Sequence, residues 1–140
     1  RLEIRGKKLD KYFDNDIFGS MIKSFQDLTV YKSSKLLYAD LLEALKTFPR
    51  QGNYLADQMR RASNSIHANI AEGYGKSQPE FKRFLTTSLG SNNELISHLE
   101  DAIIAKYLSK SVAQRLIDQY TVLGKQIYRL KEKWKNFSLN

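Results

Sequence analysis

The stretch SNSIHANIAEGYGKSQPEF, residues 63–81, contains the turn that decides the fold. The helix before this turn carries apolar residues at steps of three and four, which is the spacing of one helical face. These residues are Leu55, Met59, Ala62, Ile66 and Ile70. The helix ends at EGYG, residues 72–75, because glycine accepts the left-handed conformation that closes a helix. The stretch therefore predicts the first half of a helical hairpin.

A second helix begins at Ser77 and completes the hairpin. The Ser77 hydroxyl is a suitable cap, Pro79 lies in the first turn, and Glu80 follows the cap by three residues. We expect this helix to reach Lys106. Its inward positions are Phe81, Phe84 or Leu85, Ser88, Asn92, Leu95, Leu99 and Ile103.

Two further helices flank the hairpin. The first is expected over residues 28–47 and stops there because the residue before Pro49 avoids helical geometry. Its inward face contains Leu37, Leu41, Ala44 and Phe48. The last helix, capped by Ser109 or Ser111, keeps a heptad seam. The seam consists of Leu116, Tyr120, Leu123, Ile127, Leu130, Trp134 and Phe137. Four helices with short connections predict an all-α fold, an antiparallel up-down-up-down four-helix bundle.

The composition limits the class of protein. A chain of 140 residues with 41% hydrophobic content can bury the core of a single domain. We expect the bundle domain at residues 25–137, after an N-terminal extension at residues 1–24 that is either disordered or vector-derived. Native translation is then expected to start near Met21. The absence of cysteine and of any apolar run of ~20 residues predicts a cytoplasmic protein without a membrane partner.

A polar stripe runs along the first helix of the hairpin, beside its apolar face. Its members are Gln58, Arg61, Ser65, Asn69 and Glu72, and they face a comparable row that includes Ser91 and Glu94. We call these seven residues the polar seam and expect them to fix the two helices against each other.

A hairpin centred near Lys76 predicts the register of this polar seam. It places Arg61 across from Ser91, Gln58 across from Glu94, and Ser65 across from Thr87. Replacing Glu94 with alanine should then leave Arg61 without its partner. The free energy of unfolding should fall by roughly 1–3 kcal/mol, the penalty for a buried polar group without a hydrogen-bond partner.

The sequence contains residues that could supply two kinds of catalytic site. A serine hydrolase would use Ser63 or Ser65 with His67 and Glu72. Ser65 and His67 are two residues apart on a helix and point in different directions, however, which argues against a triad. We therefore predict no catalytic residues.

A metal-dependent nuclease would need clustered carboxylates, and the nearest set, Glu72, Glu94 and Asp101, is dispersed. The two histidines, His67 and His98, lie on different helices and lack a carboxylate at a metal-ligand spacing. We expect neither a metal site nor a cofactor.

The charge balance favours a polyanionic partner. Twenty-three basic residues against fifteen acidic ones give a formal net charge of +8. The basic residues expected to contact a phosphate backbone are Arg60, Lys76, Lys82, Arg83, Lys125, Arg129, Lys131, Lys133 and Lys135. Lys76 could also hold an isolated phosphate with the free amides at the start of the following helix. No pattern in the sequence indicates reading of base edges.

Four runs in the sequence resemble a known family. They are DLTVYK at residues 27–32, FP at 48–49, QMRRASNSIHANIAEGYG at 58–75 and EFKRFLTTSLGSNNEL at 80–95. Together they resemble the small four-helix bundle proteins encoded by intervening sequences in bacterial 23S ribosomal RNA genes, over residues 25–135. The most specific pieces are NIAEG, residues 69–73, and Gly90-Ser91 followed by Glu94.

The resemblance has limited implications for function. The family has no established enzymatic activity, so the resemblance implies a protein that is not an enzyme. The related accessory variability proteins of diversity-generating retroelements form a positively charged pentameric barrel that binds nucleic acid and a reverse transcriptase. By this similarity a homopentamer is the expected assembly. The seam residues that match the family motif are then expected to line a subunit contact; they are Arg61, Ser65, Asn69, Glu72, Ser91 and Glu94.

The leading functional prediction is a non-enzymatic homo-oligomer, with a pentamer expected, whose basic surface binds nucleic acid, RNA before DNA. The alternative is a structural or adaptor protein that recognises another protein through the same surface. A hydrolase or nuclease ranks third.

Overall fold

The computed structural model describes residues 3–4, 7–8 and 22–134. Along the chain its elements are β1 (Glu3–Ile4), β2 (Lys7–Lys8), η1 (Phe25–Asp27), α2 (Thr29–Leu45), η2 (Arg50–Gly52), α3 (Asn53–Gly73), α4 (Gln78–Ile104) and α5 (Lys110–Lys133). The four α-helices confirm the predicted all-α class. The expectations for Met21, Lys135 and Phe137 lie outside the described residues.

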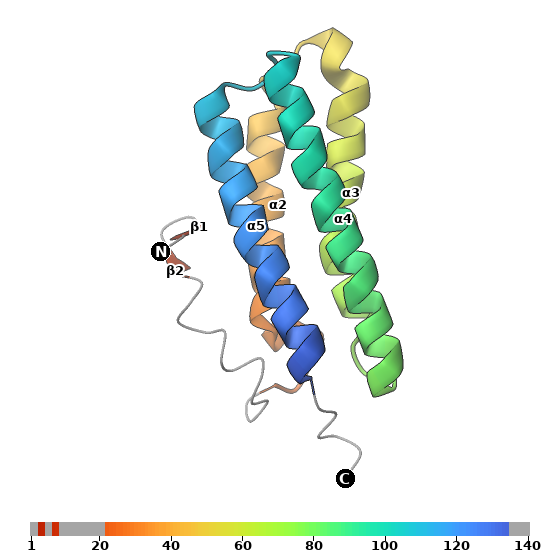
Figure 1. The fold of residues 1–140 in the computed structure, drawn as a ribbon. Coiled ribbons are helices and arrows are strands. Elements are labelled where there is room, and N and C mark those ends of the chain that lie inside the picture. Colours follow the sequence, from red (N-terminus) through yellow and green to blue (C-terminus); the bar gives the residue numbers. More distant parts are fainter. Residues whose placement is uncertain (1–2, 5–6, 9–21, 135–140) are drawn as a thin grey trace.

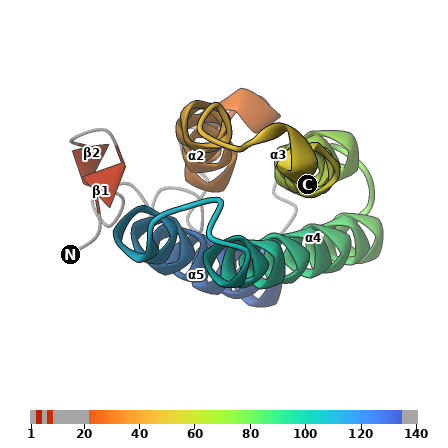
Figure 2. The same ribbon diagram turned by 90° about the horizontal axis from the view of Figure 1, so that it is seen from above.

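The four helices pack as a bundle. Seen from above, each helix lies beside the next one along the chain, and α5 returns beside α2 (Figure 2). The connections lie at alternate ends: α2 to α3 at the upper end, α3 to α4 at the lower end, and α4 to α5 at the upper end (Figure 1). The most extensive helix contacts are those of α4 with α3 and with α5. At the N-terminus β1 and β2 form a two-residue antiparallel pair that the sequence did not predict.

The predicted apolar faces form the core between the helices. Of the inward positions expected from periodicity, almost all are buried, whereas Leu55, Phe48 and Ile103 pack half-buried at its edge. At the lower end Trp134 closes the core, with its ring centroid 5.1 Å from that of Phe81 and 6.1 Å from that of Tyr74. The core therefore holds the four helices in place by burial of apolar surface.

The ends of the helices follow their capping chemistry. At the start of α4 the Ser77 hydroxyl accepts the Glu80 N–H at 3.4 Å, while Glu80 Oε2 accepts the Ser77 N–H at 3.3 Å, which confirms the predicted cap. Ser109, rather than Ser111, caps α5 through the Val112 N–H. Gly75 has a left-handed φ of +86°, as the turn requires.

The prediction that α4 reaches Lys106 is wrong. The helix ends at Ile104 because Lys106 adopts a left-handed φ of +64°. The N–H groups of Tyr107 and Leu108 then donate back to the Ala102 carbonyl, at 2.9 and 3.3 Å. This closure turns the chain into α5.

The predicted register of α3 against α4 is also wrong, by one helical turn. The Ser91 hydroxyl donates to Ser65 Oγ at 2.8 Å, so Ser65 faces Ser91 and not Thr87. The reason lies at the hairpin end, where a Cβ on Gly73 would be 2.5 Å from Phe84 Cβ. Because Gly73 packs against Phe84 and Phe81, the first turn of α4 extends beyond the end of α3.

Candidate nucleic-acid interface

The basic residues singled out from the sequence lie mostly at one end of the bundle. The start of α4, with Lys82 and Arg83, and the end of α5 both reach the lower end of the molecule, where the loop with Lys76 also lies (Figure 1). Arg60 lies apart from them on α3 and pairs with Asp57. The fold thus brings cations from two separate segments together.

All the described members of this set reach the surface. Lys82 and Lys131 are half-buried, and the others are exposed; they are Arg60, Lys76, Arg83, Lys125, Arg129 and Lys133. Lys135 lies outside the described residues. We call the members from the α3–α4 loop, α4 and α5 the basic end of the bundle.

Aromatic rings hold several of these cations. Lys76 Nζ and Arg83 Cζ lie 5.8 and 5.6 Å from the centroid of the Phe84 ring. Lys131 Nζ lies 5.3 Å from the Tyr128 ring and 3.9 Å from Glu132 Oε1. Such contacts position a cation while leaving it accessible to an anion.

The start of α4 is poorly suited to the isolated phosphate that the sequence suggested. The Glu80 carboxylate accepts hydrogen bonds from both the N–H and the hydroxyl of Ser77. A carboxylate at this position satisfies the helix dipole and repels a second anion. Lys76 is therefore better suited to a phosphate backbone that passes the outside of the loop.

Part of the polar seam forms a hydrogen-bonded contact between α3 and α4. Ser91 Oγ donates to Ser65 Oγ, and the Asn69 amide donates to the Ser65 carbonyl at 2.8 Å and to Ser65 Oγ at 2.9 Å. All three side chains are half-buried. This part of the seam therefore joins the two helices of one chain.

The rest of the polar seam faces solvent. Arg61, Glu72 and Glu94 are exposed, and Gln58 is half-buried. Within the described ranges no ion pair joins Arg61 to Glu94, so the predicted buried pair is not formed. The one-turn shift in register and the outward orientation of both side chains explain the difference.

The serine and histidine residues near the hairpin are used structurally. The Ser63 hydroxyl hydrogen-bonds the Tyr120 hydroxyl at 2.8 Å, and burial raises the pKa of Tyr120. His67 Nε2 instead lies 3.1 Å from the amide oxygen of Asn64. No hydrogen bond joins these serine and histidine side chains anywhere in the described part of the chain, so the geometry of a triad is not formed.

The environment of His67 keeps it neutral. The side chain is 3% exposed, and the edges of Tyr31 and Tyr38 pack against its ring with centroids 6.2 and 5.3 Å away. Burial, with a smaller contribution from the positive charge of Lys35, lowers the pKa of His67 to about 4. At neutral pH it packs as an uncharged aromatic side chain.

Two buried polar residues of α4 form hydrogen bonds to α3 and α5 that were not predicted from the sequence. Ser88 Oγ donates to the Ile66 carbonyl of α3 at 2.7 Å, and Asn92 Nδ2 donates to the Tyr120 carbonyl of α5 at 2.9 Å. A Cβ on Gly124 would lie 2.9 Å from Asn92 Nδ2, so glycine makes room for this amide. The sequence did contain a signal for these contacts, because both polar residues lie on the apolar face of α4.

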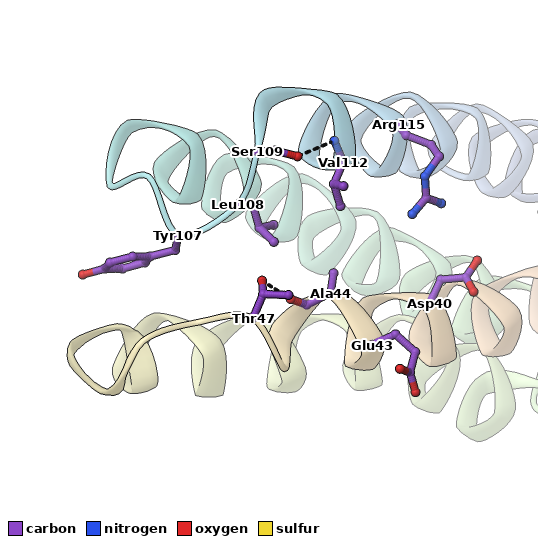
Figure 3. Close-up of a pocket in the computed structure, with 9 residues that line it drawn as sticks. All are labelled: Asp40, Glu43, Ala44, Thr47, Tyr107, Leu108, Ser109, Val112 and Arg115. Atoms are coloured by element: carbon purple, nitrogen blue, oxygen red, sulfur yellow. Dashed lines mark hydrogen bonds between the residues drawn. The ribbon is translucent and has the colours of Figure 1, made fainter.

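A hollow of about 510 Å³ lies at the upper end, between the end of α2 and the start of α5 (Figure 3). Arg115 reaches from α5 toward α2, and Asp40 lies on the facing helix (Figure 3). The polar groups around it bond within the chain: Arg115 to Gln119 at 3.3 Å and Glu43 to Lys46 at 2.9 Å.

The floor of this hollow is apolar, with Ala44, Leu108 and Val112, and the Thr47 and Ser109 side chains bond to backbone groups. The hollow could not be predicted from the sequence, because its lining comes from two helices about 70 residues apart. Periodicity shows which residues share a face of one helix, but not which faces of two helices meet. The polar side chains named around the hollow are thus engaged in hydrogen bonds within the chain.

Residues 3–4, 7–8 and 22–134 contain neither a candidate metal site nor a candidate membrane span. Within these ranges no three His, Asp or Glu side chains lie close enough together to hold a metal ion. Nor does any helix in them have the length and apolar character needed to cross a membrane.

A family model matches most of the chain. The family model described as 23S rRNA-intervening sequence protein matches residues 26–129. This range contains all of α2, α3 and α4 and most of α5. No curated protein matches the chain.

Proposed function

Because the chain belongs to the 23S rRNA-intervening sequence protein family, we propose that it is a non-enzymatic RNA-binding protein. The observation that carries the proposal is the basic end of the bundle, where cations of α4 and α5 share one end of the molecule. Lysine and arginine side chains on such a surface neutralise phosphates and release counterions. The family name supplies only a general link to RNA, and a cytoplasmic location follows from the proposed ligand.

The proposal includes a homo-oligomer of antiparallel up-down-up-down bundles, with a pentamer as the expected form. The resemblance to the pentameric accessory variability proteins supports this assembly. So does the exposure of Arg61, Glu72 and Glu94, which match the family motif and make no ion pair or hydrogen bond within the described part of the subunit. Motif residues exposed in this way are available to a neighbouring subunit.

A salt titration tests RNA binding. Binding of a labelled structured RNA and a matched DNA duplex would be measured between about 50 and 200 mM salt, with the mass of the complex followed by light scattering. We expect affinity to fall steeply with salt, because several phosphates are neutralised. The mass would give the number of subunits per complex.

The test has a control within the chain. Replacing Lys125 and Lys133 with glutamine should reduce the salt slope by about 2, whereas Lys46→Gln at the other end should leave it unchanged. Absence of binding at low salt would contradict the proposal. An adaptor protein that binds another protein through the exposed seam residues would then be the better explanation.

A further inference from the structure

A hollow of about 310 Å³ lies between the outward faces of α4 and α5, which are neighbours in both views (Figures 1 and 2). Leu89 and Ile96 of α4 and Tyr128 of α5 supply its apolar walls. Its volume lies at the lower end of the range for small-molecule sites, roughly 300–1,000 Å³. The hollow can therefore admit one planar ring.

The aromatic wall of this hollow is surrounded by cations. Tyr128 is 54% exposed, a high value for a large hydrophobic side chain. Lys125 lines the same hollow, and Lys131 Nζ lies 5.3 Å from the Tyr128 ring centroid. An exposed aromatic ring among lysines is the arrangement on which bases of single strands stack while their phosphates are neutralised.

The polar lining also suits a nucleobase. Asn92 is 1% exposed and its Nδ2 donates to the Tyr120 carbonyl, so this amide is used in packing α4 against α5. Asn93 also lines the hollow and is exposed, so its amide can offer both a donor and an acceptor to a ligand. The polar edge of a base can pair with such an amide, whereas an aliphatic side chain cannot.

We propose that the hollow between α4 and α5 receives one unpaired nucleobase of a single-stranded RNA, stacked on Tyr128, while the adjacent phosphates contact Lys125 and Lys131. This inference rests on the proposed RNA binding and specifies its ligand. A duplex keeps its bases paired and stacked, so it cannot deliver one to the hollow. The basic end then binds the backbone, and the hollow selects unpaired segments.

The test compares two strands of equal charge. One is a single-stranded oligoadenylate RNA, and the other is an abasic strand with the same number of phosphates. Tyr128→Ala should weaken binding of the oligoadenylate roughly tenfold, since stacking of one base contributes about 1–3 kcal/mol, and should leave the abasic strand unaffected. Tyr128→Phe keeps the ring and should bind as the unaltered protein does.

A matched control is Tyr54→Ala, because Tyr54 is 78% exposed but lies on α3, outside the hollow. It should change neither affinity. Equal oligoadenylate affinity of Tyr128→Ala and the unaltered protein, with steep salt dependence retained, would overturn the base site and leave RNA binding standing. Absence of binding to either RNA strand at low salt would contradict the proposed RNA binding as well as the base site. A lower assembly mass for Tyr128→Ala would overturn the inference, because a second subunit would then cover the hollow.

Discussion

The inner and outer faces of the α3–α4 hairpin carry similar polar residues and use them differently. On the inner face Ser63, Ser88 and Asn92 each hydrogen-bond a group on another helix and are at most 1% exposed. On the outer face Arg61 and Glu94 are exposed and unpaired within the described residues. Burial strengthens a polar contact between helices, because it removes the competition of water for the same hydrogen bonds.

The same contrast runs through the NIAEG motif. Gly73 is buried where Phe84 of α4 packs against α3, whereas its neighbour Glu72 is exposed. One motif therefore combines a requirement of the fold with a side chain that makes no hydrogen bond or ion pair within the described residues. Mutations on the two faces should separate these roles.

The largest effect is expected for Gly73→Ala. The new Cβ would lie 2.5 Å from Phe84 Cβ, which cannot rotate away, so the two helices must separate. We expect a loss of about 3 kcal/mol in the free energy of unfolding, measured by urea denaturation. Gly90→Ala is the matched control, because a Cβ on Gly90 meets nothing within 4 Å. It should stabilise α4 by up to about 1 kcal/mol. Equal effects of the two substitutions would contradict the close approach at Gly73.

The next largest effect concerns pH and the buried His67. The unfolded chain takes up a proton on this histidine near pH 6.5, but the folded chain does so only near pH 4. The unfolded state therefore binds more protons between these values, and stability falls as the pH decreases from 6.5 to 4. We expect a loss of about 2 kcal/mol in urea denaturation across this range.

The contribution of His67 can be separated from that of the carboxylates. His67→Phe keeps an aromatic ring between Tyr31 and Tyr38 and removes the titrating group. The pH dependence of this variant between 6.5 and 4 should be shallower than that of the unaltered protein. Identical slopes would mean that His67 takes up its proton as readily in the fold as in the unfolded chain.

A smaller effect is expected for the hydroxyl pair on the inner face. Ser63→Ala should lower the free energy of unfolding by about 1 kcal/mol, because it leaves the buried Tyr120 hydroxyl without this partner. Tyr120→Phe should cost a similar amount. The double variant should be less destabilised than the sum of the two, as thermal or urea unfolding of all four proteins would show. Strict additivity would show that the two hydroxyls do not interact.

The smallest effect on folding is expected on the outer face. Since the predicted Arg61–Glu94 pair is not formed, Glu94→Ala should change the stability of the dissociated subunit by less than about 0.5 kcal/mol. We expect it instead to lower the assembly mass measured by light scattering, while the exposed Glu100→Ala leaves that mass unchanged. A large loss of stability of the dissociated chain with Glu94→Ala would contradict the expectation that polar residues on the outer face contribute less to folding than those on the inner face.

The helices and the core could be predicted because their signals are local. Steps of three and four residues identify a buried face, and Ser77 with Glu80 marks a helix start. The register of the hairpin could not be predicted in this way, because it depends on how closely Phe84 approaches Gly73, a tertiary contact. Similarly, no local residue preference favours the left-handed conformation of Lys106.

The candidate interface was predictable only in part. The cations of α5 stand out as a run, and their grouping with those of α4 follows once the bundle is assembled. The hollow beside Tyr128 has no signal in the sequence, because it arises from spaces between residues of two helices. The charged residues of a chain can be read directly from its sequence, whereas a concave surface forms only when the helices pack together.

The position of Trp134 provides an optical signal for future measurements. It is the chain's one tryptophan, and it is buried against Phe81 and Tyr74 at the lower end of the bundle, where the basic end lies. Its fluorescence should therefore respond both to unfolding of the core and to occupation of the adjacent surface by a ligand. Folding and binding can then be followed on unlabelled protein in a single cuvette, with each transition distinguished by its dependence on denaturant or salt.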